Sequence, residues 1–507
     1  MKKVKKFVVM LVLLAMVVSA LSACGNQKEE SKGSSEKQES TAKSDEDKTE
    51  EASTPVEKPV LKWYLYGTTQ PDEAAVEEKV NSLLEGKVDA TVDFIYLDYK
   101  TYQTRVPLMM TAKEQVDIIW VCNWINPMYS TLASSGALLD LTDMMDEYCK
   151  ELQEVVPAAV LETAKIGGKL YGIPNYQNMA MQDGFFIKKD LADKYNFDMS
   201  TIKTIKDLEP YLEVIKQNEP DMIPIEWYLD QEDYEHIASK LYIAKDTTDY
   251  KVTRNMEGRK DEARMINEWY NKGYLRQDLT EVNDISGYKL EGKIAFNQAG
   301  DFKPGWEEAM VSTHGDHEWV YCTFYEPYIR ATQSQGTVNA ITAHSEYPEL
   351  ALQLLNIVNT DKEVYNTIVF GVEGEHYNKV GDNTISLIKD SGYDMGLASN
   401  WMIGNTFNGY VLEGQPENFN ELGLEYNNGV QSPIAGFSFD PTPVKTETAN
   451  VAAVEKEYTS ILFRAHLKEG ELDSKFEEFD KKLKEAGIEK IQAEMQRQLD
   501  EWVKATK

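Results

Sequence analysis

Aromatic rings stand beside side-chain amides in several loops of this 507-residue chain. Trp and Tyr can cover the apolar C–H faces of a sugar, while Asn and Gln offer the donors and acceptors that sugar hydroxyls need once water is removed. Each loop alone is a weak signal, because such residues also pack under helices. The candidate ligand-binding residues are Tyr66, Asn123, Trp124, Tyr176, Gln177, Trp227, Trp306, Asn339, Trp401, Asn405 and Asn408.

Enzyme signatures are missing from the sequence, which contains no GxSxG, P-loop, GxGxxG or HExxH motif. His314 and His317 could ligate a metal, but their hydrophilic setting favours an ordinary loop. We therefore predict no catalytic residue, no cofactor and no metal. A glycosidase needs only two suitably spaced carboxylates, so 85 acidic residues leave a glycoside hydrolase open as the alternative.

The first 58 residues predict export and anchoring. Four lysines precede an apolar run at 7–18, which is shorter than the roughly 20 residues of a spanning helix. The run ends in Leu-Ser-Ala-Cys24-Gly, which resembles the lipobox of bacterial lipoproteins and implies cleavage after residue 23 and lipidation of Cys24. Residues 24–58 are then a lipid anchor and a polar, disordered tether at the outer face of the cell membrane.

Charge and length limit what the rest of the chain, after the predicted leader and tether, can be. Removing residues 1–23 takes away four lysines and no acid, so the formal charge changes from −32 to −36, and nucleic acid is an unsuitable partner. The 449 residues at 59–507 are too many for one core and favour two lobes.

The cysteines after Cys24 are Cys122, Cys149 and Cys322, and they form no CxxC pair. The sequence allows one disulfide among them.

The pattern after residue 59 is strand, helix, strand, which is typical of a parallel sheet. Strands are expected at 60–66, 88–96 and 116–121, with helices at about 71–85 and 101–112 between them. In open α/β sheets, ligands bind off the carboxyl ends of strands. Tyr66 and the Asn123/Trp124 pair should therefore lie at one edge of the sheet.

Two stretches have the composition of connections between lobes. The segment from Pro174 to Met181 links a short strand to a strand at 185–187, and the polar segment from Thr332 to Asn339 is the expected return. An ordinary surface loop is the other interpretation of the first stretch.

Other expected elements are a strand over 321–329 broken at Pro327, a helix opened by Pro348, and a helix at 265–274 with Trp269 inward. The C-terminal helical stripe from Ile488 to Trp502 should be core.

Several blocks together resemble the extracellular solute-binding proteins (family 1) of bacterial ABC importers. They include DIIWVCNWINP at 117–127, EGKIAF at 291–296, and NAITAHSEYPELALQLLNIVNTDKEVYN at 339–366. The block FSFDPTPVKTETANV at 437–451 is similar to the C-terminal module of the LipO-type subgroup.

That resemblance implies a two-lobed, periplasmic-binding-protein-like (type II) α/β fold, each lobe a mixed sheet flanked by helices. It implies a monomer that closes on a carbohydrate, commonly an oligosaccharide, and presents it to an ABC permease. The expected lobes are 59–178 plus 335–395, and 179–334 plus 396–507 with the C-terminal helical module. After the binding protein and the glycoside hydrolase, a surface adhesin is the third and least favoured hypothesis.

Overall fold

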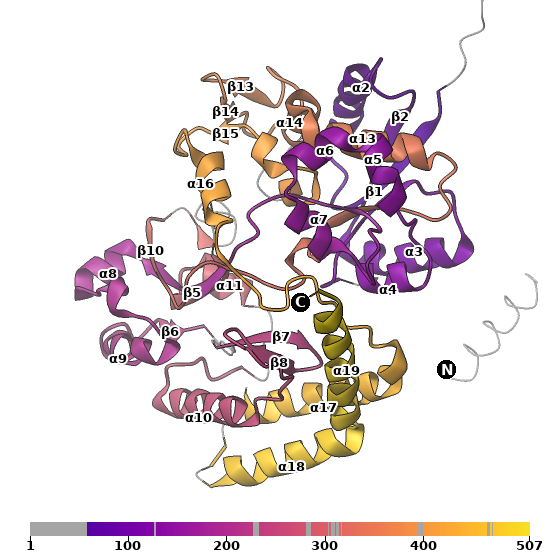
Figure 1. Ribbon diagram of the computed structural model, residues 1–507. Helices are drawn as coiled ribbons and strands as arrows, with labels where there is room; N and C mark the ends of the chain where they lie inside the picture. Colours follow the sequence, from indigo (N-terminus) through magenta and orange to yellow (C-terminus); the bar gives the residue numbers. More distant parts are fainter. Residues whose placement is uncertain are drawn as a thin grey trace, which may run out of the picture. The chain divides into compact units, whose positions relative to one another are not determined.

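The computed structural model (Figure 1) describes residues 58–506 apart from 126–127, 227–232, 280–284, 303, 306–309, 311–313, 316, 394, 396–398, 464–466 and 469. The expected leader, Cys24, the tether up to residue 57, Trp227 and Trp306 lie outside the described residues.

A five-stranded mixed sheet has the order β2-β1-β3-β12-β4. β1 is parallel to both β2 and β3, whereas β12 runs antiparallel to β3 and β4. The expected strand, helix, strand pattern is thus confirmed. The elements are β1 (Val60–Tyr66), α2 (Glu73–Leu84), β2 (Thr91–Leu97), α3 (Tyr99–Ala112), β3 (Ile118–Val121), β4 (Ile173–Pro174) and β12 (Val338–Ile341).

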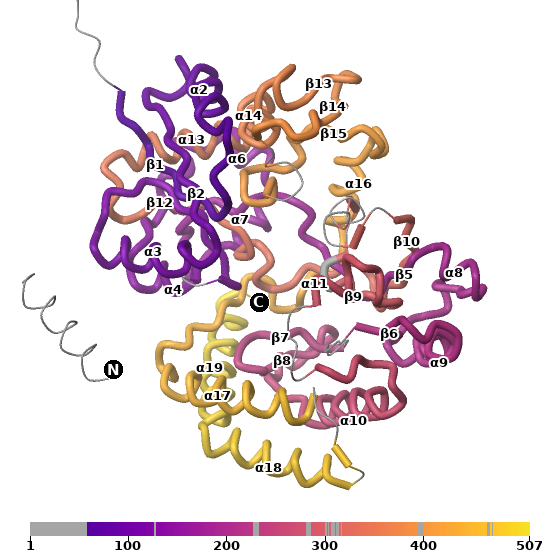
Figure 2. Tube along the Cα trace, turned by 180° about the vertical axis from the view of Figure 1, so that it is seen from behind, coloured from indigo at the N-terminus to yellow at the C-terminus, as the bar shows by residue number. Residues whose placement is uncertain are grey.

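Helices from two distant parts of the chain pack around this sheet. α14 contacts α2, and α13 contacts α6; both views place them together (Figure 1, Figure 2). Pro348 does open α13, whose apolar face is buried as expected. The helices are α4 (Tyr129–Ser134), α5 (Met145–Tyr148), α6 (Lys150–Val155), α7 (Ala158–Ala164), α13 (Pro348–Thr360) and α14 (Lys362–Phe370).

A second sheet of four strands has the order β10-β5-β9-β6. The expected helix at 265–274 is the end of a longer helix, α10, in which Trp269 is buried and Gly273 ends the helix at φ 74°. The elements are β5 (Gln182–Lys188), α8 (Lys189–Tyr195), α9 (Glu209–Asn218), β6 (Ile223–Ile225), α10 (Met256–Lys272), α11 (Ser286–Leu290), β9 (Ile294–Phe302) and β10 (Trp319–Thr323).

The C-terminal helices pack with the hairpin of β7 (Tyr234–Ala238) and β8 (Leu241–Ala244) in a third core. They are α17 (Lys445–Leu462), α18 (Glu471–Ala486) and α19 (Ile488–Thr506), and α18 also contacts α10. Ile488, Ile491, Met495 and Leu499 are all buried, so this stripe is core as predicted.

The chain passes between the two sheets at residues 175–181, as expected, and at residues 324–337. The second passage was expected at 332–339; it begins earlier, and Asn339 lies inside β12. The strand expected over 321–329 is interrupted for longer than predicted, because β10 ends at Thr323 and β11 (Tyr328–Ile329) instead pairs in parallel with β16 (Val430–Gln431). Three further strands form a small sheet, β13 (Tyr377–Lys379), β14 (Thr384–Leu387) and β15 (Val411–Leu412).

A third passage was not anticipated. Met402 and Ile403 lie in the core of the five-stranded sheet, whereas Ile434 lies in the core of the C-terminal helices. The intervening segment, with α16 (Phe419–Tyr426) and β16, therefore connects the two regions. The prediction from sequence assigned residues 396–507 to one lobe. The short turns around Trp401 have no periodic apolar pattern from which their packing on the five-stranded sheet could be predicted.

The cysteines in the described part, Cys122, Cys149 and Cys322, are buried free thiols. Burial raises the pKa of Cys122 to about 11, so its thiol is protonated and inert near neutral pH. Among the described helices, none combines the length and apolar character that crossing a membrane demands.

Candidate functional site

A group of aromatic rings lies at the carboxyl edge of the five-stranded sheet. Tyr66 ends β1, Trp124 follows β3, and Tyr99 begins α3 just after β2. Trp401 comes from a short 3-10 turn (Asn400–Met402) that lies far along the chain from these three residues. We call Tyr66, Tyr99, Trp124 and Trp401 the aromatic platform.

Ring contacts hold the platform together through the buried ring of Trp120. The centroid of Trp120 lies 6.1 Å from Tyr66, 5.9 Å from Trp124 and 5.4 Å from Trp401. Tyr66 also contacts Tyr99 at 5.9 Å, and Trp124 contacts Trp401 at 5.8 Å. These separations are those of favourable offset and edge-to-face aromatic pairs.

Exposure separates the rings that could touch a ligand from those that support them. Trp124 is 56% exposed and Tyr99 is 52% exposed, whereas Trp120 is fully buried. Tyr66 and Trp401 are half-buried. Exposed rings fixed on a rigid layer can stack against an apolar sugar face with little loss of side-chain entropy.

The base of the platform is fixed by hydrogen bonds to the passage at 324–337. Trp124 Nε1 donates to the Gly336 carbonyl oxygen at 2.7 Å, and Asn123 Nδ2 donates to Gln335 Oε1 at 2.6 Å. Trp120 Nε1 donates to Thr337 Oγ1 at 2.7 Å. The platform is therefore built directly on one of the segments that connect the sheets.

A buried amide network lies beneath the rings. Asn339 Nδ2 donates to Asn175 Oδ1 at 2.8 Å and to the Met402 carbonyl at 2.9 Å, while Asn339 Oδ1 accepts from Trp63 Nε1 at 3.1 Å. Asn175 Nδ2 also donates to the Met402 carbonyl, at 2.8 Å. This network fixes the turn that carries Trp401, and it uses the polar atoms of Asn339 within the protein.

Four other described candidates make contacts within the protein. Tyr176 is buried against Phe407 with 5.0 Å between ring centroids. Asn405 accepts from the Phe407 backbone N–H, and Asn408 Nδ2 donates to the Asn359 carbonyl. Gln177 is half-buried, and its carbonyl accepts from Asn427 Nδ2. Tyr176, Asn405 and Asn408 are thus core residues here, as is Asn339.

The structure brings together Tyr66, Asn123, Trp124 and Trp401 of the predicted set. Sequence reasoning missed Tyr99 and the supporting rings of Trp120 and Tyr102. The rule that ligands bind at the carboxyl ends of strands could have identified Tyr99. The last residue of β2, Leu97, pairs with Tyr66 at the end of β1, and Tyr99 comes two residues after Leu97. Burial raises the pKa of Tyr102, so its hydroxyl stays protonated and donates to the Trp120 carbonyl oxygen.

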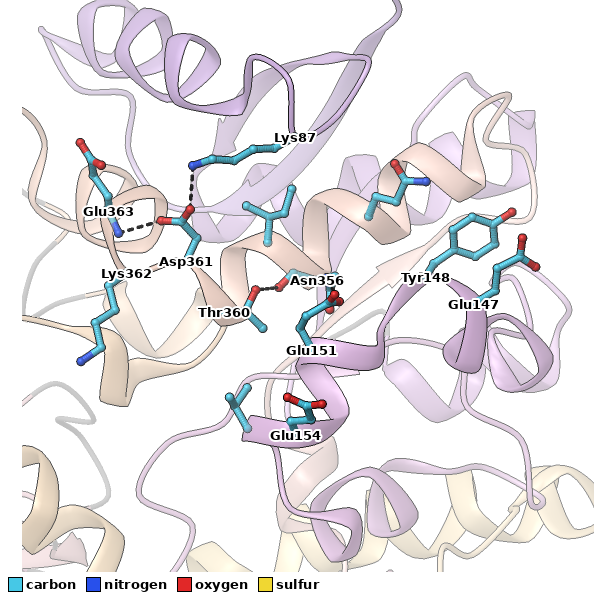
Figure 3. A pocket seen from close by; sticks show the side chains of 13 residues that line it. Lys87, Glu147, Tyr148, Glu151, Glu154, Asn356, Thr360, Asp361, Lys362 and Glu363 are labelled. Atoms are coloured by element: carbon cyan, nitrogen blue, oxygen red, sulfur yellow. Dashed lines mark hydrogen bonds and ion pairs between the residues drawn. The ribbon is translucent and has the colours of Figure 1, made fainter.

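A separate groove of about 950 Å³ lies among α5, α6 and α13 (Figure 3). Its wall carries five carboxylates, and two of them are engaged within the protein: Asp361 with Lys87 at 2.7 Å and Glu151 with Asn356 Nδ2 at 3.0 Å. Tyr148 is the ring on its wall. The platform, by contrast, brings four rings together.

Among the residues that the structure describes, no three His, Cys, Asp or Glu side chains are grouped so that they could hold a metal ion. His314 is buried, with its ring against Phe186 at 5.1 Å.

Comparison with known proteins decides the class. A family profile described as bacterial extracellular solute-binding protein matches residues 66–364, more than half of the chain. The chain belongs to this family. It is therefore a two-lobed α/β solute-binding protein of type II, a class of binding proteins and not of hydrolases. A second profile, the domain of unknown function DUF3502, matches residues 433–504.

Individual relatives agree with this assignment. A carbohydrate ABC transporter substrate-binding protein of Streptococcus pneumoniae serotype 4 is 25% identical, with 100% of each chain covered. The crystal structure of the N-glycan transport solute binding protein NgtS from Streptococcus pneumoniae has a TM-score of 0.80 at 24% identity, covering 89% of this solute-binding protein and 100% of NgtS. NgtS in complex with Man5GlcNAc has a TM-score of 0.69 at the same identity and coverage.

Proposed function

We propose that this solute-binding protein captures a neutral oligosaccharide outside the cell and delivers it to an ABC permease. The aromatic platform is the observation that carries the proposal, because four rings converge where this fold exposes its strand ends. Its relatives act on sugars: one is a carbohydrate transporter subunit, and NgtS has been crystallised with Man5GlcNAc. The formal charge of −32 disfavours an anionic ligand.

Ligand recognition at the platform would combine stacking with hydrogen bonding. Trp124 and Tyr99 offer the exposed ring faces, and Tyr66 adds a phenol hydroxyl beside them. The amide of Asn123 lies at the rim, already oriented by Gln335 and by the Ser130 backbone N–H. Trp227 and Trp306 stay candidates for the opposing lobe, and Gln177 stays a candidate in the connection between the lobes.

Capture would involve closure of two lobes about the segments that connect them. We propose residues 59–178 plus 335–412 as one lobe and 179–334 plus 430–507 as the other, with α16 in the third connection. This moves the boundary expected at residue 395, because Trp401 and Met402 pack with the five-stranded sheet. Contacts available only when both lobes meet the ligand would favour the closed state.

The function is tested by calorimetric titration of the full chain in detergent with Man5GlcNAc, a manno-oligosaccharide and an oligogalacturonide, followed by chromatography of the sugars. We expect one molecule of a neutral oligosaccharide to bind per chain, with no new reducing ends. The oligogalacturonide should bind at least about tenfold more weakly, about 1.4 kcal/mol. Turnover of any sugar, or no binding to either neutral one, would contradict the proposal.

We also propose that the mature protein is a monomer anchored through acylated Cys24. A chain with two or more acyl groups stays durably at a membrane, whereas one without them does not. Cys24→Ala is therefore expected to move most of the protein from the membrane fraction to the medium or a soluble fraction. Metabolic labelling with a fatty acid should mark the wild type alone; labelled Cys24→Ala would refute anchoring at this thiol.

A further inference from the structure

The C-terminal module at 433–504 has no assigned role, and its first residues form part of a connection between the sheets. Ile434 and Phe437 lie in one core with Leu241 and Ile243 of the β7–β8 hairpin. Ala331, from the passage at 324–337, is buried in that same core. The module therefore packs against the connecting segment itself.

A backbone ladder joins the module to this passage. The Val430 N–H donates to the Pro327 carbonyl at 2.7 Å, the Ser432 N–H to Ile329 at 2.9 Å, and the Gly436 N–H to Ala331 at 3.0 Å. β11 and β16 are the parallel strands within this ladder. Three carbonyls of the passage, at residues 327, 329 and 331, are thus bound along residues 430–436, the segment that leads into the module.

A buried carboxylate ties three elements together at the centre of the ladder. Glu235, on β7, is 5% exposed. Its Oε2 accepts from the Tyr328 hydroxyl at 2.8 Å and from Ser432 Oγ at 2.5 Å, and its Oε1 accepts from the Ala331 backbone N–H at 2.6 Å. Hydrogen bonds to a buried carboxylate are among the stronger ones in proteins.

The same passage continues to the base of the aromatic platform. Gln335 and Gly336 follow Ala331 by four and five residues, and they accept the hydrogen bonds from Asn123 and Trp124. Gln335 is fully buried, and its Nε2 also donates to the Thr163 carbonyl at 3.1 Å. Ser438 Oγ, in the module, donates to Gln335 Oε1 at 3.5 Å.

From these contacts we infer that the C-terminal module is a brace for the hinge, and that Glu235 is the positioning residue through which it fixes the passage at 327–336. The inference rests on the proposed binding function, because the passage supports the platform. Glu235 touches no ligand. It holds the connecting backbone in the geometry from which the lobes close, so less conformational entropy is lost when ligand binds.

Amide hydrogen exchange of the full chain without ligand tests the brace directly. Glu235→Ala removes three hydrogen bonds, and we expect exchange at 328–336 to become at least about tenfold faster, with no change in the five-stranded sheet. Glu235→Gln should restore protection, because its amide oxygen still accepts from Ala331 N–H while its amide N–H group donates to the two hydroxyl oxygens. Glu485→Ala, an exposed carboxylate of the same module, is the control.

Man5GlcNAc titration supplies the second readout. Glu235→Ala should raise the Kd about tenfold, and Glu235→Gln should leave it within about twofold of the wild type. Wild-type exchange at 328–336 in Glu235→Ala, or no rescue by Glu235→Gln, would overturn the brace. If Glu235→Ala does not fold, the pair Tyr328→Phe and Ser432→Ala replaces it under the same criteria. If the wild type binds no oligosaccharide, the proposed function fails, whereas the exchange experiment still decides the brace.

Discussion

Replacing Trp124 and Trp401 together by alanine is expected to weaken binding of the proposed neutral oligosaccharide by about 100-fold. Truncating an aromatic contact in a binding site commonly costs more than about 1 kcal/mol, and each 1.4 kcal/mol is a factor of ten. Trp124 is 56% exposed and meets Trp401 at 5.8 Å, so the two rings form one surface. Each single replacement should cost about tenfold.

The variant Trp124→Phe separates ring area from hydrogen bonding. It keeps an aromatic face but loses the indole N–H that donates to Gly336. We expect binding between that of the wild type and Trp124→Ala. Tyr148→Ala, which removes the ring in the separate groove of Figure 3, should leave the Kd unchanged. Equal affinities for the wild type and the double variant, measured by calorimetry, would exclude the platform as the site.

Arg259→Ala is expected to lower the free energy of unfolding of the C-terminal core by about 3–5 kcal/mol. Arg259 on α10 donates from Nη1 to Glu455 Oε1 at 3.0 Å and from Nη2 to Glu455 Oε2 at 2.7 Å. The side chains of Arg259 and Glu455 are only 5% and 11% exposed, and the guanidinium carbon lies 5.0 Å from the centroid of Phe479. Removing one partner leaves the other charge buried and unpaired.

Calorimetric unfolding distinguishes this pair from surface ion pairs. Arg497 forms pairs with Glu494 and Glu501 on the outside of α19, and its side chain is 52% exposed. Arg497→Ala should cost less than about 1 kcal/mol, because solvent screens exposed pairs. The double variant Arg259→Met, Glu455→Leu should lose less than Arg259→Ala, since no lone charge remains. Similar melting of Arg259→Ala and Arg497→Ala would show that the buried pair contributes little.

Much of the fold could be predicted because apolar periodicity is a local signal. The alternation in β2 and the stripe of α19 each predict an element with one buried face, and the continuous apolar run of β3 predicts a fully buried strand. Because ligands in open α/β sheets bind at the carboxyl ends of strands, Tyr66 and Trp124 could be placed together from their own strands alone. Trp401 came from composition alone, and its neighbours in space could not have been predicted that way.

The misplaced candidates have a common physical cause. Asn339 and Asn408 have the residue type expected of a sugar contact, but whether an amide faces a ligand or a carbonyl inside the core depends on tertiary packing. Asn339 lies on β12 with every residue of the strand buried, which no local pattern distinguishes from an exposed loop. Glu235 shows the reverse case, because an acidic residue in a polar stretch predicts an exposed side chain, whereas three donors keep it buried.

The most direct test of the central claim is a crystal structure of this solute-binding protein with bound Man5GlcNAc. We predict a sugar ring stacked at about 4 Å on Trp124 or Trp401, near van der Waals contact, with the amide of Asn123 close to a hydroxyl. A glycan bound elsewhere, with the platform left exposed to water, would contradict the assignment.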